Sequence, residues 1–202
     1  MGSSTGSGRP PPVFVITGTS GAGKGTLERA LLERMPELAL AVSATTREQR
    51  PGEQNGREYW FLTEAEFDEK IERGDFLEWV ELKWGPRSGT LHSEIERIQA
   101  VGRIPLLDLE TEGARRVRKR VPGAVTIFVK APSFEENERR LRARATEDES
   151  EIEERLDVAR AQLEEAHDFD HLIVNDDLER AVDELAELIR GELSSAGTIL
   201  RP

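Results

Sequence analysis

The chain has 202 residues and a formal net charge of −12, with 40 acidic residues against 28 basic ones. This length suits one domain, and the excess of negative charge argues against binding to nucleic acid or to an anionic membrane surface. Cysteine is absent and no apolar run approaches the ~20 residues of a membrane span, so we expect a cytoplasmic globular protein without disulfides or thiolate metal sites.

A strand, a glycine-rich loop and a helix are predicted at the start of the folded region. Residues 1–11 are rich in Gly, Ser and Pro and are expected to be disordered. Residues 13–17, "VFVIT", suit a buried parallel strand, and apolar residues recur at helical spacing over 27–35. The stretch between them, "GTSGAGKGT" at 18–26, resembles a phosphate-binding loop. Such loops hold phosphate with backbone N–H groups and with the helix N-terminus.

This loop departs from the usual pattern at one position. The pattern is Gly, four residues, Gly, Lys, and then a Ser or Thr whose hydroxyl meets the magnesium ion. Gly18, Gly23 and Lys24 obey it, but position 25 is Gly25 and the hydroxyl comes one residue later, at Thr26. We interpret the loop as a working variant, because magnesium takes few direct protein ligands and keeps several waters.

Further strands alternate with helices along the chain. Apolar and β-branched runs predict strands over 38–43, 59–61, 76–82, 104–110, 125–130 and 171–175. Capping boxes predict helices that begin after Thr63, Ser133 and Ser150. This alternation implies a parallel α/β sheet. Residues 44–90 break the rhythm with short strands and loops, including a loop predicted over 84–90, and favour an inserted substrate lobe.

Arginine residues gather in two separate stretches of this acidic chain. One set is Arg47 and Arg50, and the other is Arg140, Arg144 and Arg155. A phosphate loop serves GTPases, motor ATPases and small kinases alike. Phosphoryl transfer between two nucleotides explains both arginine sets, because two polyanions must be brought together and charge on the transferring group must be stabilised. Forked guanidinium groups suit phosphate oxygens on both sides.

The chain also resembles guanylate kinases over about residues 12–192. The resemblance rests on the phosphate loop and, in family order and spacing, on "SATTREQRPGEQNGREY", "FLEWVEL", "LLDLE", "APS", "RRLRARATE", "ERL" and "IVNDDLERA". It implies an α/β P-loop kinase fold, with a central parallel sheet flanked by helices, an inserted GMP-binding lobe and a helical lid. The implied division is a core of 12–43, 91–132 and 156–192, a lobe of 44–90, a lid of 133–155 and a flexible tail of 193–202.

The resemblance implies a role for each of several residues. Those implied to bind ATP are Gly18, Thr19, Ser20, Gly21, Ala22, Gly23, Lys24, Gly25, Thr26 and Asn175, the last beside the adenine. Those implied to bind GMP are Ser43, Arg47, Arg50, Tyr59, Glu78, Arg87, Thr90 and Glu110. The implied catalytic residues are Lys24, Arg140, Arg144 and Arg155. Mg²⁺, which accompanies ATP, is assigned to Thr26 and Asp108, acting through water.

The chemistry of guanine agrees with the assignment of Glu78. Guanine offers its N1–H and its 2-amino group side by side, and two such donors match one carboxylate. Adenine has an acceptor at N1, which the same carboxylate would repel.

The chain departs from the family elsewhere: Arg87 stands where many members have Tyr, Ser88-Gly89 inverts Gly-Ser, Glu110 replaces Asp, and Ala143 and Ala145 replace glycines.

The resemblance implies ATP-dependent phosphorylation of GMP and dGMP in purine nucleotide metabolism. The expected partners are therefore the small molecules ATP and GMP, with neither nucleic acid nor membrane, and the oligomeric state is left open. Two alternatives are a guanylate-kinase-like protein-binding module without catalysis and another nucleoside monophosphate kinase. Lys24 and the lid arginines speak against the first, while Glu78 and the segment with Arg47 and Arg50 speak against the second.

Overall fold

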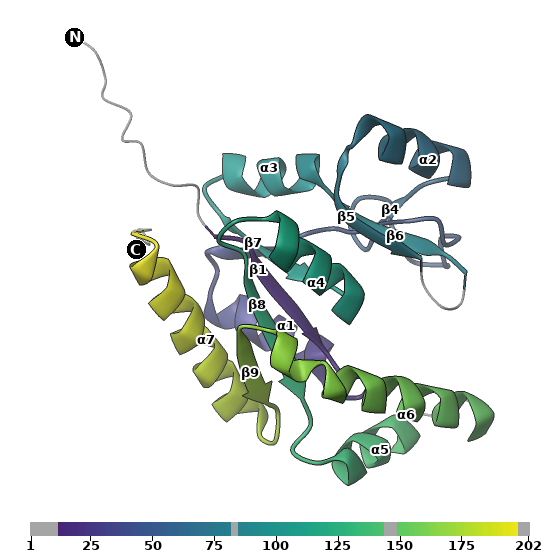
Figure 1. Cartoon of the computed structure of the whole chain (residues 1–202). Coiled ribbons are helices and arrows are strands. Elements are labelled where there is room, and N and C mark those ends of the chain that lie inside the picture. The colour runs from purple at the N-terminus through teal and green to yellow at the C-terminus, as the bar shows by residue number, and fades with distance from the viewer. Residues whose placement is uncertain (1–11, 82–84, 144–148, 198–202) are drawn as a thin grey trace.

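The centre of the molecule is a five-stranded parallel sheet with the strand order β2-β7-β1-β8-β9 (Figure 1). The computed structural model describes residues 12–81, 85–143 and 149–197. The strands of this sheet are β1 (Phe14–Gly18), β2 (Leu38–Leu40), β7 (Ile104–Asp108), β8 (Val125–Lys130) and β9 (His171–Val174). The predicted parallel α/β sheet is confirmed. Because β1 is the middle strand, the loop that follows it emerges at the centre of the carboxyl edge of the sheet.

Helices cover both faces of this sheet. Those on one face are α1 (Lys24–Arg34) and α7 (Leu178–Ser195), and those on the other are α3 (His92–Ala100) and α4 (Thr111–Arg120). Phe14 and Ile16 of β1 pack towards α1 and α7, whereas Val15 packs towards α3 and α4. A strand covered on both sides must be apolar throughout, which explains "VFVIT". No helix within the described ranges is both long and apolar enough to cross a membrane.

A second sheet is formed entirely by residues 44–91. Its order is β4-β3-β6-β5, and its strands are β3 (Ala44–Thr45), β4 (Trp60–Phe61), β5 (Phe76–Glu81) and β6 (Arg87–Leu91). Helix α2 (Glu64–Arg73) covers it through Phe67, which packs on Phe76 and Leu91 in a small separate core. These strands fall in the stretch predicted to be an inserted lobe. The division of the chain into core, lobe and lid stays a prediction.

The ends of α2 agree with the predicted capping box. The Thr63 hydroxyl accepts a hydrogen bond from the N–H of Glu66 at 3.2 Å, and the Glu66 carboxylate accepts one from the N–H of Thr63 at 2.8 Å. Gly74 ends the helix with φ of 71°, a left-handed conformation that glycine adopts without strain. Local sequence therefore determines both boundaries of this helix.

One predicted strand and one predicted loop were wrong. The predicted strand over 38–43 ends at Leu40, because the backbone turns away and the N–H of Val42 donates instead to the carboxylate of Glu94 at 2.9 Å. The predicted loop over 84–90 contains the strand β6, which pairs antiparallel with β5. Its sequence, rich in Gly and Ser, has little strand propensity of its own, so the pairing with β5 decides its conformation.

Helices α5 (Phe134–Ala143) and α6 (Glu149–Glu164) pack together through Leu141, Ile152 and Leu156. A short 3-10 helix, η1 (Ala166–Asp168), follows α6 and precedes β9. The chain is already helical at Glu149, so Ser150 lies inside α6 and the capping role predicted for it was wrong. An acidic residue suits the first turn of a helix because it meets the positive end of the helix dipole.

Candidate active site

The phosphate loop connects β1 to α1 and encloses a cavity. Its glycines Gly21 and Gly23 have φ of 86° and 83°, values that side chains with a Cβ atom rarely adopt. A Cβ atom on Gly23 would also lie 2.7 Å from the amide nitrogen of Asn175. The loop cavity, of about 310 Å³, is lined by residues 18–25 together with Glu110, Arg155, Val158 and Gln162. A loop of this shape at a helix N-terminus is suited to hold phosphate.

Two buried amide side chains hold this loop from α5 and α6. Asn137, which is 1% exposed, donates to the carbonyl of Ser20 at 2.8 Å and accepts from the hydroxyl of Thr19 at 3.2 Å. Gln162 accepts a hydrogen bond from the N–H of Ser20 at 3.2 Å. The sequence analysis missed both residues. The signal for Asn137 is an amide one helical turn before the buried Leu141, a place where a polar side chain needs a partner.

Asn175 and Arg140 hold the same loop from its other side. Asn175, at the end of β9, is buried and donates from its side-chain amide to the carbonyl of Ala22 at 2.8 Å. Arg140 donates to the carbonyl of Asn175 at 3.0 Å and to that of Ala22 at 3.4 Å, while Glu136 accepts from its Nε at 2.7 Å. The structure thus turns Asn175 towards the loop backbone, and its predicted contact with adenine stays a prediction.

Of the other two predicted lid arginines, Arg155 is part of the described structure and Arg144 is not. Arg155 of α6 lines the loop cavity, opposite the phosphate loop. Arg144 lies outside the described residues. A cationic side chain from α6 therefore faces the space that phosphate would occupy.

Lys24, at the start of α1, forms an ion pair with Asp108 at the end of β7. Burial lowers the pKa of the Lys24 ammonium, and the carboxylates of Glu28 and Glu110 act in the opposite direction. Lys24 also lines a second cavity of about 150 Å³, the lobe cavity. Glu110 is the other residue that lines both cavities. The two cavities therefore meet at Lys24 and Glu110.

The lobe cavity lies between the central sheet and the second sheet. From the second sheet and the segments beside it, its lining includes Ser43, Tyr59, Glu78 and Ser88. Glu78 is 1% exposed, and its Oε1 accepts from the N–H of Thr90 at 2.9 Å and from the Thr90 hydroxyl at 3.0 Å. Burial raises the pKa of Glu78 to about 6, although the bonds from Thr90 favour its charged form. One oxygen of this carboxylate is thus fixed by the protein.

Arg47 and Tyr59 lie together beside this cavity. The guanidinium of Arg47 donates to the two carboxylate oxygens of Glu53 at 2.8 and 3.1 Å, and its Cζ lies 5.3 Å from the centre of the Tyr59 ring. The backbone N–H of Arg50 donates to the same carboxylate at 2.8 Å, while its side chain is exposed. The carboxylate of Glu53 therefore joins the side chain of Arg47, which lies beside Tyr59, to the backbone of Arg50, and the predicted contact of these residues with GMP stays a prediction.

Arg87 lies on the opposite side of β6 from the lobe cavity. Its guanidinium pairs with Glu64 and Asp68 of α2 and lies 4.7 Å above the ring of Phe67. Ser88, the next residue, lines the cavity instead. Successive strand residues point to opposite faces, so Ser88 and not Arg87 faces the cavity here, and the predicted contact of Arg87 with GMP stays a prediction. The alternation along "RSGT" could have revealed this, had that stretch been interpreted as a strand.

The groups near the phosphate loop offer few direct ligands to a metal ion. Within the described residues, no cluster of three or more His, Cys, Asp or Glu side chains could hold one. Asp108 contributes a partly exposed carboxylate, Thr26 is exposed on the first turn of α1, and no atom lies within 4 Å of a Cβ placed on Gly25. Such a site fits Mg²⁺, which keeps several waters and uses phosphate oxygens as ligands.

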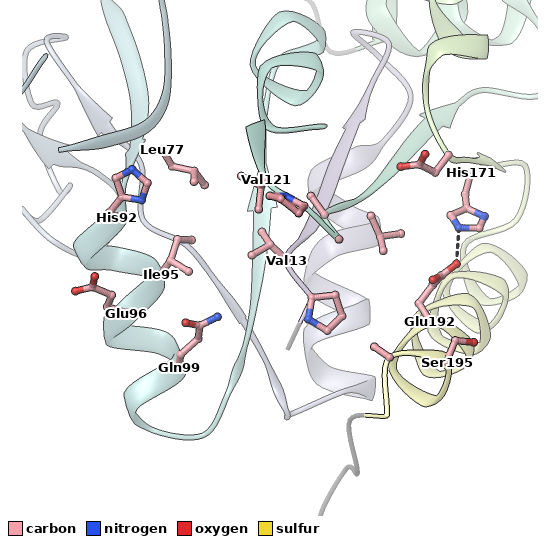
Figure 2. Close-up of a pocket in the computed structure, with 17 residues that line it drawn as sticks. Val13, Leu77, His92, Ile95, Glu96, Gln99, Val121, His171, Glu192 and Ser195 are labelled. Carbon is pink, nitrogen blue, oxygen red and sulfur yellow. Dashed lines mark hydrogen bonds and ion pairs between the residues drawn. The ribbon is translucent and has the colours of Figure 1, made fainter. Parts of the chain in front are cut away.

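A larger cavity, of about 670 Å³, lies at the amino ends of the strands (Figure 2). It is lined by Val13, by His92 and Gln99 of α3, and by His171, whose ring nitrogen lies 2.9 Å from the Glu192 carboxylate. Ligands of open α/β sheets bind at the carboxyl ends of the strands, where the phosphate loop lies. This cavity, although larger than the loop cavity and the lobe cavity, is therefore not the candidate active site.

Comparisons with known proteins agree with this geometry. The family model for guanylate kinase matches residues 11–192. The guanylate kinase of Rubrobacter xylanophilus is 48% identical over 178 residues, which cover 88% of this chain and 93% of that protein. The guanylate kinase of Prochlorococcus marinus strain MIT 9313 is 47% identical over 189 residues, which cover 94% and 98%.

A solved structure has the same overall arrangement. The crystal structure of guanylate kinase from Anaplasma phagocytophilum superposes with a TM-score of 0.71 at 27% sequence identity, covering 95% of this chain and 97% of that one. The similarity in sequence and the similarity in structure each extend over nearly the whole chain. The chain belongs to the guanylate kinase family.

Proposed function

We propose that this protein transfers the γ-phosphoryl group of ATP to the phosphate of GMP, or of dGMP, forming ADP and GDP. The observation that carries the proposal is the position of Lys24, which lines both the loop cavity and the lobe cavity. ATP would enter the loop cavity and GMP the lobe cavity, so their phosphates would meet at this lysine. The reaction would belong to cytoplasmic purine nucleotide metabolism and GMP recycling.

The loop cavity has the chemistry to hold the donor. The backbone N–H groups of residues 18–25 bind the β- and γ-phosphates, and Lys24 neutralises the oxygens between donor and acceptor. Arg155 approaches from α6 and stabilises charge on the transferring group. Asp108 and Thr26 would hold the waters of a bound Mg²⁺, which would supply further positive charge to the phosphate oxygens.

The lobe cavity has the chemistry to select and orient the acceptor. The carboxylate of Glu78 accepts from the N1–H and the 2-amino group of guanine, with Ser43 and Thr90 beside it. Arg47, Arg50 and Tyr59 hold the GMP phosphate from the other end. That phosphate is already anionic at neutral pH, so the attacking oxygen needs no general base; orientation and electrostatic stabilisation suffice.

A coupled assay of ADP release tests this proposal. With ATP and Mg²⁺ present, we expect rapid ADP release with GMP and at most slow release with AMP, UMP or CMP. Preference for another monophosphate would replace GMP as the substrate. No release with any of them, together with retained GMP binding, would favour the non-catalytic binding module.

A further inference from the structure

Gly113 lies in the first turn of α4, directly against the carboxylate of Glu78. It is the third residue of that helix, a place where glycine is costly because it loses more conformational freedom than alanine would. Its φ is not positive, so its backbone conformation is open to any residue. Neither helix formation nor backbone geometry therefore explains why the residue is glycine.

The space beside Gly113 is filled by Glu78. A Cβ atom at position 113 would stand 2.8 Å from Oε2 of Glu78 and 3.5 Å from its Cδ. Real Cβ atoms do not approach an oxygen this closely, so one of the two groups would have to move. The absence of a side chain at position 113 is thus what lets Oε2 occupy its observed place.

Neither partner can easily move away. Oε1 of Glu78 is fixed by the N–H and the hydroxyl of Thr90, so rotation of the carboxylate would break two buried hydrogen bonds. Helix α4 is held against β5 by Arg116, whose guanidinium donates to the carbonyl of Trp79 and lies 5.7 Å from the centre of its indole ring. A side chain at 113 would therefore displace the carboxylate rather than the helix.

We propose that Gly113 is a positioning residue for base selection: it leaves the space that sets Oε2 of Glu78 in the plane of the bound guanine. The inference rests on the proposed function, in which Glu78 accepts from the two guanine donors. Gly113 does not touch the substrate in this proposal and acts only through Glu78. If a side chain at position 113 displaced Oε2, the Glu78 carboxylate would keep its charge. It would lose the alignment with the two adjacent donors of guanine.

The first experiment compares Gly113→Ala with Gly191→Ala. Gly191 is also inside a helix, α7, but no atom lies within 4 Å of a Cβ placed on it. We expect Gly113→Ala to raise the KM for GMP at least tenfold and to leave the KM for ATP within twofold, while Gly191→Ala changes neither. Equal increases for ATP and GMP, or no increase for GMP, would overturn the proposal.

The second measurement reads base selection directly. IMP lacks the 2-amino group, so the ratio of kcat/KM for GMP to that for IMP reports how well the carboxylate meets both donors. Gly113→Ala should bring this ratio towards one, whereas a general loss of structure would lower both values together. An unchanged ratio contradicts the proposal.

A pair of variants separates the contact from a folding defect. In a Glu78→Ala background the obstructing carboxylate is gone, so Gly113→Ala should raise the melting temperature, as alanine in a helix does. In the wild-type background the same change should lower it. If Gly113→Ala lowers the melting temperature equally in both backgrounds, the obstruction does not involve Glu78 and the inference fails.

The wild-type protein and Glu78→Gln distinguish this failure from failure of the proposed function. If the wild type prefers GMP and Glu78→Gln loses that preference, the proposed function holds whatever Gly113→Ala does. If the wild type does not use GMP, the proposed function fails and the inference fails with it.

Discussion

The two cavities of the candidate active site are built in different ways. The phosphate loop is held by three neutral amides from distant elements, Asn137, Gln162 and Asn175, and Arg140 adds a bond to its backbone. The region around the lobe cavity is held by ion pairs between residues close in sequence, such as Arg47 with Glu53. The buried charge that faces this second cavity is Glu78.

This difference agrees with the ligand that is proposed for each cavity. Phosphate is bound by backbone N–H groups, so the protein needs only to fix the loop, and an amide does so without the cost of burying a charge. Guanine is distinguished from adenine by two donors, which require an acceptor of full negative charge. The protein therefore accepts a buried carboxylate with a raised pKa in the second cavity, as is common where a charge has a function.

Removing the lysine that both cavities share should have the largest effect. We expect Lys24→Ala to lower kcat by about 100-fold or more, the ~3 kcal/mol of one preorganised transition-state contact. GMP binding measured by calorimetry without ATP should change little. Lys119→Ala, at an exposed position of α4, is the control. Near-normal turnover of Lys24→Ala would mean that the phosphates do not meet at this residue.

Removing the buried charge should affect only the acceptor. Glu78→Gln should lower kcat/KM for GMP by an amount that corresponds to ~2–3 kcal/mol of lost transition-state stabilisation. The amide keeps the shape of the side chain but loses a charge-assisted contact. The KM for ATP should not change. A parallel loss for ATP would point to damage of the fold rather than to loss of base recognition.

In the wild type, the KM for GMP should depend on pH because the charge of Glu78 does. The pKa of Glu78 is raised to about 6, so its carboxylate is charged above that pH and neutral below it. The KM for GMP should therefore rise as pH falls below about 6, approaching tenfold for each pH unit. In Glu78→Gln this dependence should become shallower, because only the second ionisation of the GMP phosphate, which also lies at about pH 6, remains. A profile that is unchanged in the variant would assign the titration to another group.

A buried charge in place of Asn137 should destabilise the protein, because the phosphate loop would then be contacted by a carboxylate instead of a neutral amide. Asn137→Asp replaces the amide that donates to Ser20 with a buried carboxylate, and we expect the free energy of unfolding to fall by about 2 kcal/mol. The KM for ATP should rise and that for GMP should not. Asn55→Asp, at an exposed position, is the matched control. Equal stability of the two variants would show that the phosphate loop does not depend on a neutral side chain at position 137.

Restoring the usual hydroxyl of the loop should have the smallest effect. Among the described residues beyond the neighbouring backbone, no atom lies within 4 Å of a Cβ placed on Gly25, so Gly25→Ser fits, and in the wild type a water on the magnesium ion would stand where this hydroxyl would act. We expect turnover within about tenfold of the wild type, or ~1.4 kcal/mol, and a larger loss for Thr26→Ala. Magnesium titrations of both variants check this. A hundredfold gain for Gly25→Ser would identify the present loop as defective.

The parts of the structure around the site that could be predicted from the sequence are those encoded locally. The strand, phosphate loop and helix around Lys24 follow from an apolar run, glycines and helical spacing within a short stretch, and the capping box of α2 likewise lies within a few residues. Glu78 could be assigned because guanine chemistry requires such a group. No long-range information was needed in these cases.

The parts that were missed depend on contacts between distant segments. Asn137 and Gln162 are unremarkable in their own helices, and only the fold brings them to the phosphate loop. Ser88 rather than Arg87 faces the lobe cavity because β6 becomes a strand only by pairing with β5. Gly113 matters only because α4 lies against Glu78, which comes from another sheet.

The place of Lys24 in the walls of both cavities also links the two binding equilibria. A phosphate on one side of this ammonium changes the electrostatic potential on the other side, so the affinity for either nucleotide depends on whether its partner is present. Thermodynamic linkage makes this dependence mutual: the factor by which ATP alters the dissociation constant of GMP equals the factor by which GMP alters that of ATP. In the proposed arrangement, this one lysine would make the two substrates sensitive to each other.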